Sequence, residues 1–250
     1  MQKLLFISFI SIFFTSCSSN WGWYVINPTL PGGYINVKFL LSGLWYTIVL
    51  SITAISISIV LGLIVALPGI SSNKTFKGFN RFYVEIVRSV PILVLILWVY
   101  YGLPQIMNIS IGVFWAGVIA LSLSDSAFMA EIFRAGIQSI SRGQYEAAHS
   151  ISLNYRDTMR FIILPQALTH VLPGIVNTFI GLFKDTTLVS IIGIFEVMGI
   201  FRAASQDANW GSHVQHATSY LVAATVFFIF CFGMSRYSIY IENKLSRDNK

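Results

Sequence analysis

Charged residues are scarce in this chain of 250 residues. Asp, Glu, Lys and Arg together make up 10% of it, whereas hydrophobic residues make up 55% and the mean hydropathy is +0.71. Soluble domains usually carry about 25% charged residues. So much apolar surface cannot be hidden in one soluble core, so the composition excludes a soluble domain and predicts a protein that lies in lipid.

Cysteine and histidine are also rare. The two cysteines, Cys17 and Cys231, are too few and too far apart for a disulfide framework or a metal site. Of the four histidines, only His213 and His216 stand three apart, and two ligands in a solvated loop make a weak metal site. His, Asp, Ser and Cys do not converge at catalytic spacing. We therefore predict no metal, no cofactor and no enzymatic activity in this chain.

Three sequence patterns are missing. The chain has no GxxxxGK[ST] pattern, so it should not bind ATP through a P-loop. It shows no internal self-similarity, which argues against an ion-coupled secondary transporter built from repeats. No basic run is interleaved with aromatic residues, so we expect no nucleic-acid partner.

The sequence is dominated instead by long apolar runs. A helix of about 20 residues crosses a bilayer core of about 30 Å, and the runs lack the alternation of membrane strands. We predict an all-α membrane protein with about five transmembrane helices, at residues 38–67, 83–107, 111–133, 168–201 with an interruption, and 220–241. The first and fourth runs are longer than a bilayer requires, so we expect tilt or broken geometry in both.

Basic residues mark one side of this arrangement. Twelve of the sixteen lysines and arginines fall on the same side of a five-span chain. They are Lys74, Lys77, Arg81, Arg88, Arg134, Arg142, Arg156, Arg160, Arg236, Lys244, Arg247 and Lys250. The positive-inside rule makes that side cytoplasmic. We therefore expect the N-terminus outside, the C-terminus inside, and contact of the basic residues with anionic membrane lipid.

The N-terminus forms a segment of its own. Lys3 precedes an apolar stretch that is too short to span a bilayer, which is typical of a secretory signal over residues 1–17. Residues 18–37 would then be an external segment. The letters FTSC at 14–17 loosely resemble a lipoprotein cleavage site, so cleavage, lipidation at Cys17 and retention as an extra helix all stay open.

One comparatively polar stretch, ISRGQYEAAHSISLNYRDTMRFIILPQAL at residues 140–168, interrupts the apolar runs. Residues 144–151 can form two helical turns, in which Ala147 and Ala148 permit close approach of another backbone. Glu146 offers an anionic group to a basic partner surface.

Further along the same stretch, Asn154 and Asp157 have the spacing of a capping box and predict a second short helix over 155–163. Pro165 then opens the next segment in its first turn, where its missing N–H costs little. The stretch is therefore predicted to fold as helix, turn, helix.

This stretch resembles the EAA loop of the membrane-spanning subunits of bacterial ABC importers. The resemblance implies a coupling loop at about residues 140–167 that seats on a separate ATPase subunit, through Gln144, Glu146, Ala147, Ala148 and Ser152. The family usually has Gly where this chain has Ser152. Either Asn154 takes over the special backbone angle or the turn is built differently.

Three further segments resemble the polar amino-acid subgroup of these permeases, of the histidine, glutamine, arginine and glutamate type. They are RSVPILVLILWVYYGLP at 88–104, SDSAFMAEIFRAGIQSISRGQ at 124–144 and LFKDTTLVSIIGIFEVMG at 182–199. The resemblance implies a permease domain at 38–245 and a cytoplasmic tail at 246–250.

The same resemblance implies several partners. They are ABC ATPase subunits, a second permease subunit that is the same or a related chain, and a periplasmic or lipid-anchored binding protein that delivers an amino-acid substrate. The identity of that amino acid stays open, and an ABC permease for another small solute is the alternative.

Several charged residues fall inside apolar runs and are functional candidates, because a charge at the bilayer centre costs about 2.5–3.5 kcal/mol even on a lenient scale. They are Asp125, Glu131, Lys184, Asp185 and Glu196. Asp125 either faces a cavity, where it would favour a basic or ammonium group, or forms a hydrogen-bonded carboxyl between helices. Lys184 and Asp185 point to different faces of a helix. The letters KDT at 184–186 resemble a pattern that the polar amino-acid subgroup shares whatever its substrate, and this resemblance implies a gate or broken helix rather than a specificity site.

Two helix faces complete the candidate set. On the fourth span, His170, Gly174, Asn177, Gly181 and Lys184 recur at spacings of four and three, and this face is predicted to line the pathway or the seam with a second permease. For the two glycines, close helix packing is an equal alternative. Glu131 and Arg134 stand three apart at the cytoplasmic end of the third span, and we expect them to pair and couple this span to the loop, with contact to the substrate as the alternative.

Overall fold

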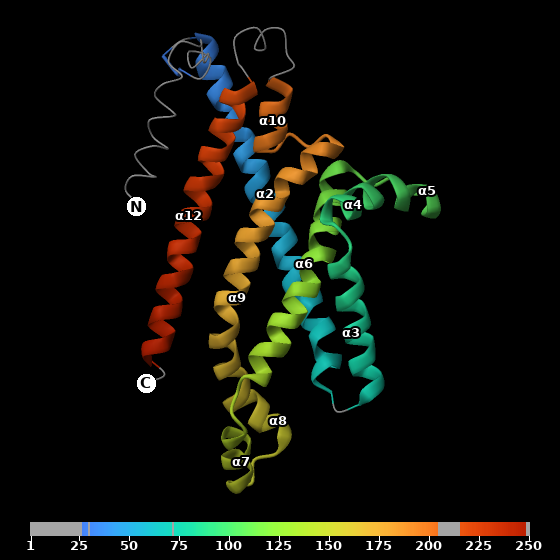
Figure 1. Cartoon of the computed structure of the whole chain (residues 1–250), viewed down its shortest axis with the longest axis vertical. Coiled ribbons are helices and arrows are strands. Elements are labelled where there is room, and N and C mark those ends of the chain that lie inside the picture. Colours follow the sequence, from blue (N-terminus) through green and yellow to red (C-terminus); the bar gives the residue numbers. More distant parts are fainter. Residues whose placement is uncertain (1–26, 30, 72, 205–215, 249–250) are drawn as a thin grey trace, which may run out of the picture.

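The computed structural model describes residues 27–29, 31–71, 73–204 and 216–248, and these residues form helices and no strands (Figure 1). The predicted all-α membrane architecture is confirmed. The signal-like segment 1–17 with Cys17, most of the segment 18–30 and His213 lie outside the described residues.

α2 (Pro31–Ile70) is the longest helix and begins before the expected start at residue 38. It has no break along its length, so of the tilt or broken geometry expected for the first span only tilt is left. Its inner face carries small residues, including Ala54, Ser58 and Gly62, and packs against α6. A Cβ at Gly62 would overlap Met129 of α6, so the two backbones approach closely here because this residue has no side chain.

α6 (Val113–Gln138) forms the centre of the core, with α2, α3 and α9 packed around it. Its buried residues are mostly small, and those from Ala116 to Ala130 are nearly all inaccessible. Ser122 donates to the backbone carbonyl of Ala54 on α2 at 3.1 Å, and the Tyr83 and Ser126 hydroxyls lie 2.7 Å apart, joining α3 to α6. These hydrogen bonds give the buried hydroxyl groups partners, which the hydrocarbon core of a membrane could not supply.

The second predicted span, 83–107, is not one straight helix, which corrects the prediction. α3 (Lys74–Ser89) ends before Val90, and α4 (Ile92–Leu97), the π-helical turn η2 (Trp98–Gly102) and α5 (Leu103–Met107) turn away from it by 94°. Pro91 has no N–H and disfavours the helical conformation of the residue before it, and Val90 is accordingly extended. Figure 1 shows the α4–α5 arm running sideways from the top of α3.

The fourth predicted span is broken as expected, but it starts earlier than predicted. α8 (Tyr155–Asp157), the π-helical η3 (Thr158–Ile163) and α9 (Leu164–Asp185) follow one another directly, so the second helix of the polar stretch does not end at Ile163. Pro165 lies in the first turn of α9, as predicted. The widened turn before it makes room for its ring, which would otherwise clash with a carbonyl one turn back.

Beyond α9 the chain changes direction twice. The 3-10 helix η4 (Thr186–Ile192) ends at Gly193, whose φ of 96° is a left-handed angle that glycine accepts without strain. α10 (Val197–Ala204) and α12 (His216–Asp248) complete the chain, and α12 packs against α9 and α10. Phe183 of α9 stacks on Phe230 of α12 with ring centroids 5.9 Å apart.

Within the described residues, four helices are long and apolar enough to cross a membrane, and the bent pair of α3 with α4–α5 would be a fifth. In Figure 1, α7 (Arg142–Ser150), α8 and the turn between α2 and α3 lie at one end of the molecule, while α10 and the α4–α5 arm lie toward the other. The predicted five spans agree with this count only if the bent pair is taken as one span.

Candidate functional site

The polar stretch folds into the predicted helix, turn and helix. α7 (Arg142–Ser150) is followed by a turn and then by α8, whose start is capped by Asn154. The Oδ1 atom of Asn154 accepts from the backbone N–H of Asp157 at 2.9 Å, and its Nδ2 atom donates to the Asp157 carboxylate at 2.6 Å. The predicted cap is therefore confirmed.

The turn itself is made by Ser152. This residue adopts φ 61°, the left-handed conformation, whereas Asn154 has an ordinary φ of −73°. The family usually has glycine at the position of Ser152, and one alternative was that Asn154 adopts the left-handed angle instead. The structure excludes this alternative. The backbone keeps the glycine-type turn, and the serine bears its conformational cost of about 1–2 kcal/mol.

The two alanines of α7 have different surroundings. Ala148 is 1% exposed and buried within the chain, while Gln144, Glu146 and Ala147 are exposed. α7 packs against η3, so the small size of Ala148 serves the loop's own packing. Ala147 is the alanine that leaves room for another backbone.

A groove runs between α7 and α8 on this loop. It encloses about 670 Å³ and is lined by Tyr145, Glu146, His149, Ser150, Leu153, Asn154, Tyr155 and Thr158. Burial, followed by the neighbouring Tyr155 phenol, raises the pKa of Tyr145, so this hydroxyl remains a neutral hydrogen-bonding group. The groove therefore presents one carboxylate, Glu146, among hydroxyl, amide, imidazole and phenol groups.

The loop is attached firmly to two membrane helices. A small apolar cluster joins Ile137 of α6 and Ile140 to Ile163 and Ala167 at the base of α9. The Ser139 hydroxyl lies 2.7 Å from Nδ1 of His170, which ties the end of α6 to α9. These contacts link the two ends of the loop to α6 and α9.

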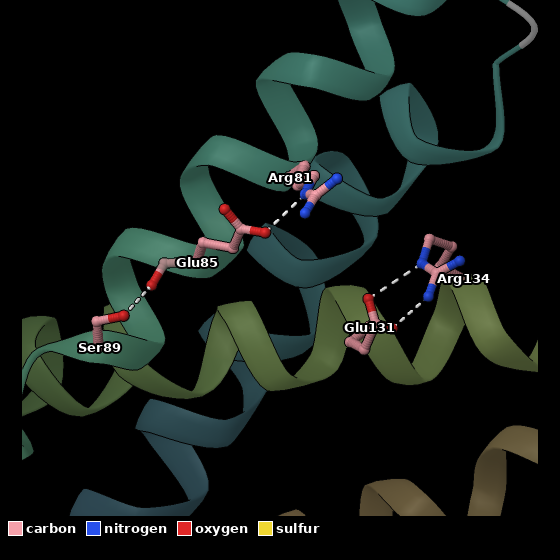
Figure 2. A network of polar contacts seen from close by, with 5 residues as sticks. All are labelled: Arg81, Glu85, Ser89, Glu131 and Arg134. Carbon is pink, nitrogen blue, oxygen red and sulfur yellow. Dashed lines mark hydrogen bonds and ion pairs between the residues drawn. The ribbon is translucent and has the colours of Figure 1, made fainter.

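The predicted Glu131–Arg134 pair is present. Arg134 donates from Nη2 to Oε1 and from Nε to Oε2 of Glu131, the latter at 3.0 Å, and its Nη1 donates to Gln138 at 2.6 Å. Figure 2 shows this pair on α6 opposite a second ion pair, Arg81 with Glu85 at 2.6 Å, on α3. The bidentate geometry fixes the planar guanidinium group against α6.

Both pairs line one cavity of about 460 Å³ between the end of α2, the length of α3 and the end of α6. Its charged residues are Lys77, Arg81, Glu85, Arg88, Glu131 and Arg134. Four cations and two carboxylates give the lining a net positive charge. We refer to this space as the basic cavity.

A second, smaller cavity lies where the end of α3 and the start of α4 meet the middle of α6 and the end of α9. It encloses about 190 Å³ and is lined by Val87, Arg88, Val90, Ile92, Ser124, Asp125, Phe128 and Asp185. Two of the predicted pathway candidates, Asp125 on α6 and Asp185 at the end of α9, thus meet in one place. We call this space the acidic cavity.

The predicted polar face of α9 splits into two parts. His170, Asn177 and Lys184 are exposed, and a Cβ added to Gly181 would meet no atom within 4 Å. Gly174 is different, because a Cβ there would lie 3.0 Å from the Ile132 side chain of α6. Packing within the chain therefore accounts for Gly174, while Gly181 lies on an open face of this subunit.

Glu196 has a structural explanation. It is fully buried and caps α10, accepting from the backbone N–H groups of Met198 at 2.9 Å and Gly199 at 2.8 Å. A carboxylate that accepts several backbone N–H groups at a helix N-terminus is compensated there. Glu196 therefore needs no role in transport to explain its position.

From the sequence, Lys77, Arg81 and Arg88 were expected only to mark the cytoplasmic side, and Glu85 was not singled out. Lys77, Arg81, Glu85 and Arg88 stand four, four and three residues apart, which places all four on one face of α3. That face lines the basic cavity, and Arg88 lines the acidic cavity as well. The periodicity of these charges was the signal that could have identified a polar lining.

The sequence and the fold match known proteins. The model of the family described as "Binding-protein-dependent transport system inner membrane component" matches residues 58–247. The glutamate/glutamine/aspartate/asparagine transport system permease protein BztC of Rhodobacter capsulatus is 40% identical over 214 residues, which cover 83% of this chain and 48% of that protein. This chain thus spans about half the length of BztC.

Two further relatives match over most of their length. The arginine transport system permease protein ArtQ of Bacillus subtilis is 32% identical over 89% of this chain and 98% of its own. The crystal structure of an amino acid ABC transporter with histidines superposes with a TM-score of 0.76 at 34% identity, covering 83% of this chain and 94% of that one. The chain therefore belongs to the family of binding-protein-dependent transport system inner membrane components, the membrane-spanning permeases of ABC transporters.

Proposed function

We propose that this chain is the permease subunit of an ATP-driven importer that moves a polar amino acid delivered by an external binding protein. The observation that carries the proposal is the attachment of the coupling loop to the ends of α6 and α9. These helices also supply Asp125 and Asp185 to the acidic cavity. The names of the relatives, which are permeases for amino acids, support this substrate class.

The proposed drive acts through α7. ATP is hydrolysed by a separate ATPase subunit, and exposed Gln144, Glu146 and Ala147 seat on that subunit. Ala148 and Ser152 contribute by fixing the shape of the loop, one by its buried contact and one by its left-handed backbone. Glu131 and Arg134 hold the last turns of α6 together so that they move with the loop.

The proposed pathway lies along α9 and the two cavities. Asn177, Gly181 and Lys184 form a face that this subunit leaves open, and a second permease subunit, the same or a related chain, would cover it. Polar groups inside a membrane usually face a bundle interior or a water-filled route. Asp125, Asp185 and Lys184 line or gate the route between the two subunits.

The proposed orientation puts the loop in the cytoplasm. The start of α3, which carries Lys74 and Lys77, lies toward the same end of the molecule as α7 and α8 with their arginines, and the positive-inside rule assigns that end to the cytoplasm. The N-terminus is then outside and the C-terminus inside, and the end with α10 and the α4–α5 arm meets the periplasmic or lipid-anchored binding protein.

The test is uptake by a reconstituted importer. The permease is purified with its ATPase and second permease subunits, placed in proteoliposomes, and supplied with the binding protein and a mixture of radiolabelled amino acids. We expect uptake that requires ATP and the binding protein and that survives dissipation of ion gradients by ionophores. Uptake that follows an ion gradient without ATP would establish a secondary transporter instead.

A further inference from the structure

The basic cavity holds more positive charge than its own carboxylates neutralise. Four cations and two carboxylates line it, which leaves an excess of two positive charges. Two of the cations are paired, Arg134 with Glu131 on α6 and Arg81 with Glu85 on α3. The other two line the space without a carboxylate of their own, so the cavity is suited to an anionic ligand.

The two remaining cations differ in their surroundings. Neither Lys77 nor Arg88 forms an ion pair with a carboxylate of the described residues. The guanidinium carbon of Arg88 lies 4.8 Å from the centroid of the Phe128 ring, and Arg88 also lines the acidic cavity with its two carboxylates. Lys77 is exposed in the first turn of α3, one helical turn before Arg81. Within the described part of the chain, Lys77 is therefore the cation of this cavity that can hold an anion without giving up another contact.

The wall behind these charges is already formed. Asn80 is buried, and its amide donates to the backbone carbonyl of Val65 on α2 at 2.7 Å. Gly69 permits this approach, because a Cβ there would lie 2.8 Å from the Oδ1 atom of Asn80. The cavity of about 460 Å³ lies within the range of about 300–1,000 Å³ that is usual for small-ligand sites. A preformed site binds more tightly because the ligand does not have to order it.

The outer face of α3 is apolar and uncovered within this subunit. Phe79, Phe82 and Ile86 stand three and four apart, so they share one helix face, and they are 60%, 65% and 47% exposed. Consecutive residues are about 100° apart around a helix, so Phe82 lies beside the charged face that includes Arg81. A ligand that has an anionic group for the charged face and apolar chains for the neighbouring face matches both.

The position of α3 selects a lipid as this ligand. The helix begins toward the same end of the molecule as α7 and α8, the end assigned to the cytoplasm, and runs from there into the membrane (Figure 1). The acyl chains of the cytoplasmic leaflet run in the same direction, from the charged surface toward the bilayer centre. Lys77 therefore comes at the level of the headgroups, and Phe82 and Ile86 come deeper. Basic pockets between membrane helices on the cytoplasmic side are typical binding sites for anionic headgroups.

We propose that the basic cavity binds the phosphate group of an anionic phospholipid of the cytoplasmic leaflet, with Lys77 as the anchoring cation and the acyl chains along Phe79, Phe82 and Ile86. The choice of leaflet rests on the proposed orientation, whereas the binding does not depend on amino-acid import. A lipid bound here bridges α3 and the last turns of α6, which lead into the coupling loop. A zwitterionic lipid has no net negative charge and leaves the excess positive charge of the cavity in place.

The test measures lipid binding to the purified permease–ATPase complex in detergent by native mass spectrometry. Dioleoyl phosphatidylglycerol is compared with dioleoyl phosphatidylcholine, which has the same acyl chains but no net charge. We expect the wild type to bind phosphatidylglycerol at least about tenfold more tightly, and Lys77→Gln to lose most of this preference. Lys77→Arg keeps the charge and should retain the preference. Lys244→Gln, which changes an exposed lysine of α12 outside the cavity, is the matched control and should bind both lipids as the wild type does.

Soluble phosphates separate a lipid from a free anion. Glycerol 3-phosphate and inorganic phosphate carry the charge without acyl chains, so neither should displace phosphatidylglycerol at an equal concentration. Displacement by either of them would overturn the assignment to a lipid.

The remaining outcomes also decide the inference. Equal binding of the two lipids by the wild type would overturn it, and this comparison needs no variant, so it decides even if Lys77→Gln does not fold. An equal loss of preference in Lys77→Gln and Lys244→Gln would show attraction to the whole basic surface and overturn the site. Because no transport is measured, each of these failures leaves the importer function standing.

Discussion

Arg88 of α3 stacks on Phe128 of α6, with the guanidinium carbon 4.8 Å from the ring centroid. This contact lies immediately before the bend at Pro91 and joins the end of α3 to the middle of α6. Both residues line the acidic cavity. The stacking therefore fixes a cation at the point where the two cavities meet.

The stacking predicts that Arg88 cannot be replaced by lysine without loss. Arg88→Lys keeps the charge but loses the planar group that covers the ring, an interaction of about 0.5–2 kcal/mol. We expect several-fold lower ATP-driven amino-acid uptake by the reconstituted importer. Arg81→Lys, on the same helix face but in an exposed ion pair, should transport nearly normally. Equal activity of the two variants would contradict a positional role for Arg88.

The exposures of the two alanines of α7 predict different defects. Ala147→Arg adds bulk and charge on the exposed side of the loop, so it should abolish substrate-stimulated ATP hydrolysis with unchanged thermal stability. Ala148→Arg places the same side chain in a buried position and should also destabilise the subunit by about 1–3 kcal/mol or more. Normal stimulated hydrolysis in Ala147→Arg would remove this face from the drive mechanism.

Ser152 predicts a gain in stability. Its φ of 61° costs a serine more than a glycine, so Ser152→Gly should stabilise the permease by about 0.5–1 kcal/mol after the extra chain entropy of glycine is counted. Thermal unfolding in detergent measures the difference. Ser152→Val, which is β-branched, should move the melting temperature the other way. A lower melting temperature for Ser152→Gly would show that the serine side chain makes a stabilising contact.

Local features of the site could be predicted from the sequence because they depend on neighbours in the chain. The cap of α8 requires only Asn154 and Asp157, and the ion pair on α6 requires only Glu131 and Arg134. The apolar spans could also be located from the sequence, because hydropathy is averaged over neighbouring residues. The bend at Pro91 was missed because apolar residues continue on both sides of it, although a proline with an extended predecessor is a helix-ending signal.

Features that depend on distant residues could not be predicted. The periodicity of α7 shows that Ala147 and Ala148 occupy different faces, but it does not show which face packs on η3. The acidic cavity combines Arg88, Asp125 and Asp185 from three helices, and their meeting depends on the bend after α3 and on the break after α9. The sequence identified the two carboxylates as candidates but did not place the cation beside them.

The orientation predicts which positions an impermeant thiol reagent can reach. In a variant with Cys17→Ser and Cys231→Ser, single cysteines at Thr75 and Arg142 should be protected in intact cells, because basic residues mark the cytoplasmic side. A cysteine at Ala208, in the segment expected to be external, should react. Permeabilised cells provide the control, in which both protected positions become labelled. Labelling at Arg142 from outside would overturn the assigned orientation.

A substitution at Gly181 tests whether the polar face of α9 lines a pathway or a seam between subunits, or instead contacts lipid. Its missing Cβ has no neighbour within 4 Å, so Gly181→Leu should leave the fold of this subunit intact and fail only where a second permease or the substrate approaches. We expect it to block amino-acid uptake while the subunit retains its melting temperature. Leu182→Ile, a volume-conserving change at a buried position, should cost less than about 1.5 kcal/mol and transport normally.

Gly174→Leu separates packing from pathway on the same helix. A side chain there meets Ile132 of α6, so this variant should lower the melting temperature whether or not a partner is present.

Lys184→Met tests the charge on the open face, and we expect uptake of all amino acids to fall alike because this exposed cation does not line the acidic cavity. If Gly181→Leu and Lys184→Met both transport normally, the face contacts lipid, and the route must follow α3 and α6 past Arg88 and Asp125.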